Sequence, residues 1–126
     1  MRVYVAAPWV RKAEAIAAGQ RLEAEGFLVT SRWFDHNGDP LDPTGLSSGR
    51  SDIRHQARED LVDVCRSNAL VVLNLEKSEG KAVETGVALI TGIPVISVGT
   101  RSNIFQSLGY EVNTLDDAIR ILHSLT

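Results

Sequence analysis

The chain has 126 residues, 44% of them hydrophobic, which suits one domain with a single core. Its formal net charge of -3 gives no positive excess for binding nucleic acid or an anionic membrane. No apolar run approaches the roughly 20 residues that cross a bilayer, and the strand-like start is too short for a signal peptide, so we expect a cytoplasmic protein.

Cysteine and histidine residues give no sign of a metal or redox site. Cys65 is the only cysteine, which excludes an intrachain disulfide. The histidines, His36, His55 and His123, lack the spacing of metal ligands. We therefore expect neither a metal nor another cofactor.

Short β-branched runs alternate with helical patterns along the chain. Nearly continuous apolar runs are typical of strands covered on both faces, which are usually parallel. The predicted strands cover 2–7, 27–33, 69–75 and 94–99, with a weaker fifth at 110–113. The predicted helices cover 10–26, 51–68, 80–92 and 114–126. Ser51 and Thr114 are candidate N-caps, and Gly26 and Gly92 are expected to end their helices.

This order predicts an α/β fold: a three-layer α/β/α sandwich around a flavodoxin-like or Rossmann-like parallel sheet of about five strands, in the order 2-1-3-4-5. The whole chain, 1–126, is expected to be one domain. Such sheets bind ligands beyond the carboxyl ends of their strands, where the strand order reverses. The long polar connection at 34–50 is either a surface excursion or a wall over a site at the end of the second strand.

The helix predicted at 51–68 carries an acid on its apolar stripe. Asp60 falls next to Ile53, at the edge of the arc formed by Ile53, Ala57, Leu61 and Val64. The residues expected on a solvated face are His55, Arg58, Glu59 and Asp63. An acidic side chain on a buried stripe needs a hydrogen-bonding or charged partner, or it has a functional role. Asp60 is therefore either a structural residue bonded to nearby backbone or hydroxyl groups, or a residue that touches a ligand.

The stretch "SEGKAVETG" places Glu84 early in the helix that follows the third strand. A carboxylate there stabilises the helix start, but the same place is where an open α/β sheet binds its ligand. Gly80 is expected to allow close backbone approach, and Gly86 close packing on the sheet. Neither a dinucleotide-binding nor a P-loop motif is present. Two carboxylates, Glu84 and Asp60, suit chemistry at an acetal-like carbon, with one as the nucleophile.

Three stretches resemble the nucleoside 2-deoxyribosyltransferase family and its hydrolytic branch, the 2'-deoxynucleoside 5'-monophosphate N-glycosidases. They are "VYVAAPW", "ARED" with "LVDVCRSNALVVLNL", and "GKAVETGVALITGIPVISVG". The resemblance covers most of the chain and is weakest at 34–50. It implies that Glu84 is the nucleophile, that Asp60 is the family's helix aspartate, and that Tyr4 positions the nucleophile or a sugar hydroxyl.

One position departs from the transferases that act on free nucleosides. They carry an aspartate six residues before the glutamate, where this chain has Ser78. The monophosphate hydrolases have a phosphate-contacting serine there, which favours a nucleotide substrate, because a hydroxyl accepts a phosphate that a carboxylate repels. The hydrolases' other phosphate ligands are replaced by "APWVRK", in which Arg11 or Lys12 are either substitutes or solvated charges. Glu79 is a second candidate for the missing acid.

Further candidates follow the other strands. Trp33 and Phe34 either sandwich a base or are core or rim aromatics, and the same two interpretations apply to Trp9. The resemblance implies a homodimer or higher homo-oligomer in which Asn103 or Ser102 reaches a neighbour's site; otherwise 99–105 is a simple loop.

The leading interpretation is an enzyme that cleaves the N-glycosidic bond of a (2'-deoxy)nucleoside or its 5'-monophosphate, with water or another base as acceptor. Two alternatives stay open: a non-catalytic nucleotide-sensing module, which the missing acid at Ser78 favours, and a NAD or ADP-ribose glycohydrolase. Neither nucleic acid nor a membrane is an expected partner.

Overall fold

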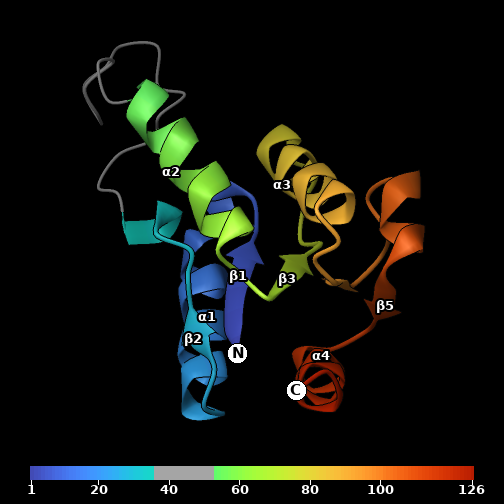
Figure 1. Cartoon of the computed structure of the whole chain (residues 1–126). Coiled ribbons are helices and arrows are strands. Elements are labelled where there is room, and N and C mark those ends of the chain that lie inside the picture. Colours follow the sequence, from blue (N-terminus) through green and yellow to red (C-terminus); the bar gives the residue numbers. More distant parts are fainter. Residues whose placement is uncertain (36–52) are drawn as a thin grey trace.

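The computed structural model describes residues 1–35 and 53–126. Within them, one parallel sheet is formed by β1 (Arg2–Ala6), β2 (Leu28–Val29), β3 (Ala69–Leu73), β4 (Val95–Val98) and β5 (Tyr110–Val112). The strands lie in the order β2-β1-β3-β4-β5, which confirms the predicted α/β fold and strand order (Figure 1). The order reverses between β1 and β3, so the carboxyl ends of these two strands mark the expected ligand position.

Four α-helices cover the sheet. They are α1 (Lys12–Ala24), α2 (Ile53–Cys65), α3 (Glu79–Ile90) and α4 (Leu115–Ser124). Helices α2 and α3 pack against each other (Figure 1), while α1 and α4 are joined by an ion pair of 2.8 Å between Arg21 and Asp116. The contact between α2 and α3 brings the two acid-bearing helices together.

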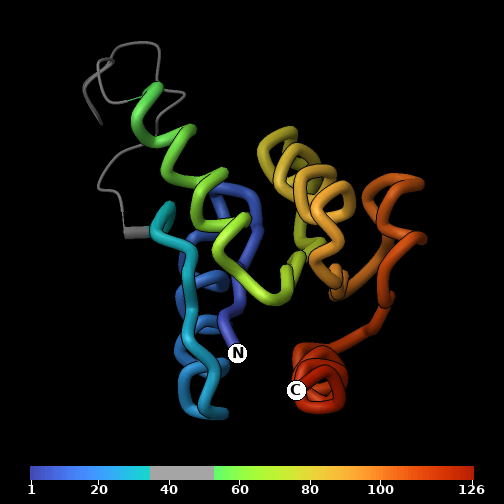
Figure 2. The backbone as a smooth tube through the Cα atoms, in the orientation of Figure 1, coloured from blue at the N-terminus to red at the C-terminus, as the bar shows by residue number. Residues whose placement is uncertain are grey.

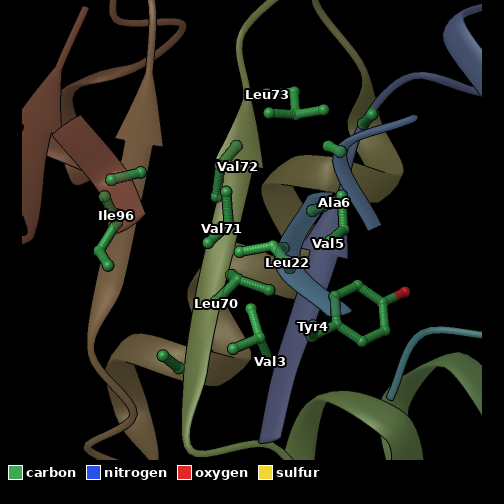
Figure 3. Packing of buried hydrophobic residues seen from close by; sticks show 14 of the residues in the cluster. Val3, Tyr4, Val5, Ala6, Leu22, Leu70, Val71, Val72, Leu73 and Ile96 are labelled. Carbon is green, nitrogen blue, oxygen red and sulfur yellow. The ribbon is translucent and has the colours of Figure 1, made fainter. Parts of the chain in front are cut away.

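The core is built on the two central strands, β1 and β3. All five residues of β3 are buried, as are the last four of β1. Figure 3 shows Val3 and Val5 of β1 beside Leu70 and Val72 of β3. Tyr4 lies in the same cluster, but its hydroxyl group points away from the strand. A polar atom is thus carried to the edge of an apolar core, where it needs a partner.

The second strand is shorter than the predicted 27–33. Only Leu28 and Val29 form β2, and the chain then leaves the sheet. The side chain of Ser31 replaces the backbone as partner of β1, because its Oγ accepts a hydrogen bond of 3.0 Å from the amide of Val5. The 3-10 turn η2 (Trp33–Asp35) follows directly. This early exit places Trp33 over the end of β1.

Most predicted helix boundaries hold within two or three residues. Gly26, with φ of 94°, ends α1, and Thr114 caps α4 by accepting from the amide of Asp117 at 3.1 Å. Position 51 and most of the connection at 34–50 lie outside the described residues, so the predicted cap and wall there stay predictions. The 3-10 helix η4 (Ile104–Leu108), which Asn103 caps, was not predicted.

Two glycines have roles that differ from those expected. Gly86 was predicted to allow close packing on the sheet, but a Cβ atom there would have no neighbour within 4 Å, so that prediction is wrong. Gly109 is the residue that needs to be small, because its Cβ would lie 2.4 Å from the carbonyl oxygen of Val95. Close approach of backbones therefore occurs beside β4 and not in α3.

Both termini lie at the amino ends of the strands. Met1 and Thr126 line the same shallow hollow, and Figure 2 shows the two chain ends on one side of the molecule. The expected ligand position lies at the opposite edge of the sheet, where the strands end.

Candidate active site

A cavity of about 400 Å³ lies at the carboxyl ends of β1 and β3, between α2 and α3. Ala7, Trp9 and Trp33 form one wall, and α2 contributes Asp60 and Gln56 among others. The start of α3 contributes the remaining lining residues, which are Ser78, Glu79, Gly80, Lys81, Val83 and Glu84. Its volume suits a small organic ligand. The fold thus brings Asp60, Ser78, Gly80, Glu84, Trp9 and Trp33 to one cavity.

Tyr4 and Glu84 meet at the floor of this cavity. The hydroxyl group of Tyr4, a fully buried residue in the middle of β1, donates a hydrogen bond to Oε2 of Glu84. The pKa of Glu84 is raised to about 8, mainly by burial and also by the negative charge of Asp60, while the hydrogen bond from Tyr4 opposes this rise. The pKa of Tyr4 is raised far above its ordinary value by burial and by the charges of Glu84 and Asp60, so its proton stays in place.

Asp60 faces the same cavity from α2. Its Oδ1 atom is buried and has no hydrogen-bond partner among the described residues. Burial raises the pKa of Asp60 to about 6; the charges of Asp63 and Glu59 add to this, while the charge of Arg32 opposes it. A structural aspartate held by backbone or hydroxyl groups would have both oxygens paired. Asp60 therefore lines the cavity while one of its oxygens has no structural partner.

Asp63 was expected on a solvated face, and that expectation is wrong. The residue is 1% exposed and accepts hydrogen bonds from Arg32: 3.1 Å from the backbone amide and 2.7 Å from Nη2. Its partner follows β2 in the chain, 31 positions away, so helical periodicity alone does not reveal it. The pair ties α2 to the end of β2. It also places one positive and one negative charge near Asp60.

Helix α3 begins at the residue that departs from the transferase pattern. Ser78 is the N-cap, and its Oγ accepts a hydrogen bond of 3.3 Å from the amide of Lys81. A Cβ at Gly80 would meet only this oxygen, at 3.8 Å, so the backbone there is open to the cavity. A helix start with free amides favours an anion.

Sequence reasoning missed Lys81, although it stands inside the stretch that carries Glu84. The residue is 1% exposed, and burial lowers its pKa. Its Nζ donates to Oδ1 of Asn74 at 3.1 Å, to the carbonyl of Glu76 at 2.8 Å and to Oγ of Ser102 at 3.0 Å. All three ammonium protons are thus used within the protein. Lys81 fixes the start of α3 to the end of β3 and to the segment after β4.

The aromatic residues do not form the predicted sandwich. Trp33 and Phe34 contact each other edge to face, with centroids 5.2 Å apart, which leaves no space between them for a base. Trp33 is held by a bond of 2.8 Å from its Nε1 to the carbonyl of Val5. Trp9 lies 6.2 Å from Trp33 and also lines the cavity. A base can therefore contact this wall from one side.

Three other predicted residues lie away from the cavity. Asn103 caps η4 and is absent from the cavity lining of its own chain. Ser102 is bonded to Lys81 and Asn74. Arg11 pairs with Glu14 at 3.0 Å and with Glu76 at 2.9 Å, so its guanidinium already has two carboxylates. A role for Asn103 in a neighbour's site stays a prediction.

The described parts of the chain contain no group of three or more His, Cys, Asp or Glu side chains arranged to hold a metal ion. None of the helices in residues 1–35 and 53–126 has the length and apolar character needed to cross a membrane.

Replacing Glu84 with glutamine should change how stability depends on pH. The carboxyl pKa rises from an ordinary 4.5 to about 8 on folding, so the wild type loses stability as pH rises through this window. Glu84→Gln lacks that loss, and near pH 9 it should gain about 1 kcal/mol or more relative to the wild type, compared with near pH 5.

Chemical denaturation at the two pH values measures the effect. The control is Ala82→Gln, an exposed change on the same helix, whose difference from the wild type should be equal at both. A constant offset for Glu84→Gln as well would mean that the folded protein does not raise the pKa of Glu84.

Neither the models of known families nor the curated protein sequences give a match to this chain.

Solved structures are similar over nearly the whole chain. A 2-deoxyribosyltransferase from Bacillus psychrosaccharolyticus has a TM-score of 0.67 at 17% identity, over 94% of this chain and 90% of that one. A protein from Enterococcus faecalis V583 has a TM-score of 0.66 at 20% identity, over 100% and 99%. A CMP N-glycosidase from Clostridium botulinum has a TM-score of 0.58 at 15% identity, over 98% of both chains. The chain therefore has the fold of a 2-deoxyribosyltransferase and of a CMP N-glycosidase, the two kinds of protein that its sequence resembles.

Proposed function

We propose that this protein is an enzyme that cleaves the N-glycosidic bond of a nucleoside 5'-monophosphate or nucleoside through a covalent glycosyl-Glu84 intermediate. The observation that carries the proposal is the Tyr4–Glu84 hydrogen bond at the floor of a cavity that Asp60 also lines. The similarity in fold to a deoxyribosyltransferase and a CMP N-glycosidase supports it.

Glu84 acts as the nucleophile in this proposal. Its carboxylate oxygen forms a bond to the anomeric carbon while the bond from that carbon to the base nitrogen breaks, and the electron pair leaves with the base. The transition state carries positive charge on the sugar. A fixed carboxylate in a poorly hydrated cavity stabilises that charge more strongly than water does. Tyr4 orients the carboxylate through its hydrogen bond and keeps its own proton.

Asp60 supplies the proton that the leaving base needs. With pKa values of about 8 and about 6, Glu84 and Asp60 together hold one proton near neutral pH. The reactive form has that proton on Asp60 and a free carboxylate on Glu84. Asp60 then protonates the departing base, and afterwards takes a proton from the water or second base that attacks the glycosyl-enzyme.

A 5'-phosphate fits the start of α3. The helix presents free amides and the positive end of its dipole there, beside the hydroxyl of Ser78 and the open backbone of Gly80. CMP, the substrate named for the glycosidase of the same fold, is a 5'-monophosphate. We therefore favour a nucleotide over a free nucleoside as substrate.

Glu84 is tested with a panel of nucleosides and their 5'-monophosphates, incubated with and without a second free base and resolved by chromatography. The wild type should release free base. Glu84→Ala should lower turnover at least about 10³-fold and keep binding measurable, because it removes the nucleophile and leaves the cavity walls. Full activity in Glu84→Ala would remove the mechanism.

Two further results of the panel separate the alternatives. Saturable binding without any product would favour the sensing module. Release of nicotinamide from NAD would favour the glycohydrolase.

Ser78 is tested by Ser78→Asp, which keeps an N-cap residue and adds a negative charge. Repulsion of the phosphate should lower kcat/KM for the monophosphate relative to the free nucleoside by about tenfold or more. Steady-state kinetics on both substrates gives the ratio, and thermal unfolding checks that α3 is intact. If the ratio does not change, Ser78 does not contact the phosphate.

A second copy of the chain is the proposed partner of an exposed apolar surface on α3 and η4. Val83 and Ile90 lie seven residues apart on one face of α3, 57% and 90% exposed. Helix η4, which contacts α3, exposes Ile104 and Leu108. Val83 also lines the cavity, so a dimer through this surface extends the cavity wall and brings Asn103 toward a neighbour's site. Light scattering should give a dimer for the wild type and a monomer for Ile90→Lys. A monomeric wild type would contradict this assembly.

A further inference from the structure

Gln56 is a buried side chain for which the proposed reaction has no use. It lies on α2 one helical turn before Asp60 and lines the same cavity. Only 8% of the residue is exposed, and its Oε1 atom is buried with no hydrogen-bond partner among the described residues. Proteins seldom leave such an oxygen unpaired, because burial removes its water. A ligand that occupies the cavity is the natural source of the missing donor.

The surroundings of Gln56 suit a flat heterocycle. Trp9 and Trp33 supply aromatic surface on the neighbouring wall, and Ile53 and Ala57 of α2 add apolar side chains. A base can contact such a wall through its ring faces and still needs one polar group to read its edge. The amide of Gln56 is well suited to this, since it presents an acceptor and a donor side by side.

Asp60 and Gln56 occupy different positions along α2. Gln56 and Asp60 share a face of the helix, about 6 Å apart along its axis. In the proposed reaction Asp60 and Glu84 act at the bond between sugar and base. The base extends from that bond, and Gln56 is the nearest uncharged polar side chain that α2 contributes to the cavity.

We propose that Gln56 selects the base, and that its Oε1 accepts a hydrogen bond from an exocyclic amino group. This inference rests on the proposed function. It names the substrate class as nucleotides of amino-bearing bases, such as cytosine and adenine. In the orientation that the structure gives this amide, their oxo counterparts, uracil and hypoxanthine, direct a carbonyl oxygen at Oε1 and leave it unpaired, which disfavours them.

The test compares matched substrates that differ only in this group. Cytidine and uridine 5'-monophosphates form one pair and adenosine and inosine 5'-monophosphates the other, in both ribose and 2'-deoxyribose forms. For the wild type, kcat/KM should favour the amino member about tenfold or more. Gln56→Met keeps the length of the side chain and removes the acceptor, so the ratio should fall to about one. Val62→Met, an exposed change on the same helix, should keep the wild-type ratio.

Thermal unfolding separates recognition from a structural role. Removing an unpaired buried oxygen takes away no hydrogen bond, so Gln56→Met should unfold at the same temperature as the wild type or a higher one. A loss of several degrees would mean that Gln56 supports the fold, and would overturn the inference.

Binding measurements keep this inference separate from the proposed function. Quenching of Trp9 and Trp33 fluorescence by the same nucleotides, in Glu84→Ala, needs no turnover. An amino preference that Gln56→Met removes supports the inference even if no base is released. Turnover with an unchanged ratio in Gln56→Met overturns the inference and leaves the proposed function standing, as does a preference for the oxo members. The absence of both binding and turnover overturns both.

Discussion

The burial of one carboxylate is the constraint on which the other features of the site depend. Glu84 sits where α2 and α3 close over the end of β1, and Tyr4 gives it a hydrogen bond from inside the sheet. The charge of Asp60 makes the ionised form of Glu84 still less favourable. Positive charge that develops on a sugar in this cavity relieves that cost. Ionisation of Glu84 in the empty site is therefore unfavourable in the way that would favour the proposed transition state.

Much of this arrangement follows from local sequence signals. Alternation of β-branched runs with helical patterns is enough for the strand order, because parallel strands and right-handed crossovers leave few other solutions. The convergence of Asp60 and Glu84 follows as well, since one interrupts an apolar stripe and the other stands at a helix start beyond a buried strand. Tyr4 was assigned through a resemblance, and its contact with Glu84 agrees with that assignment.

The residues that were missed have partners far away in the chain. Asp63 is bonded to Arg32, and Lys81 is bonded to Ser102. In both cases helical periodicity identifies the face of the helix but not the residues that pack on it. Gly109 is constrained by the carbonyl of Val95, a contact between two different elements. Gln56 was not predicted for another reason. A glutamine in a charged helix has no distinctive sequence pattern, and only the structure shows that its oxygen is buried and unpaired.

The cap at Ser78 has an evolutionary consequence. Serine, asparagine and aspartate all begin helices well, so α3 can start at any of them without loss to the fold. The residue at position 78 can therefore vary with the ligand, because a hydroxyl and a carboxylate both serve as the N-cap of α3. A hydroxyl suited to a phosphate and a carboxyl group suited to proton donation can therefore replace each other at this position while α3 still folds. A change of substrate within this architecture needs no compensating mutation at the helix start.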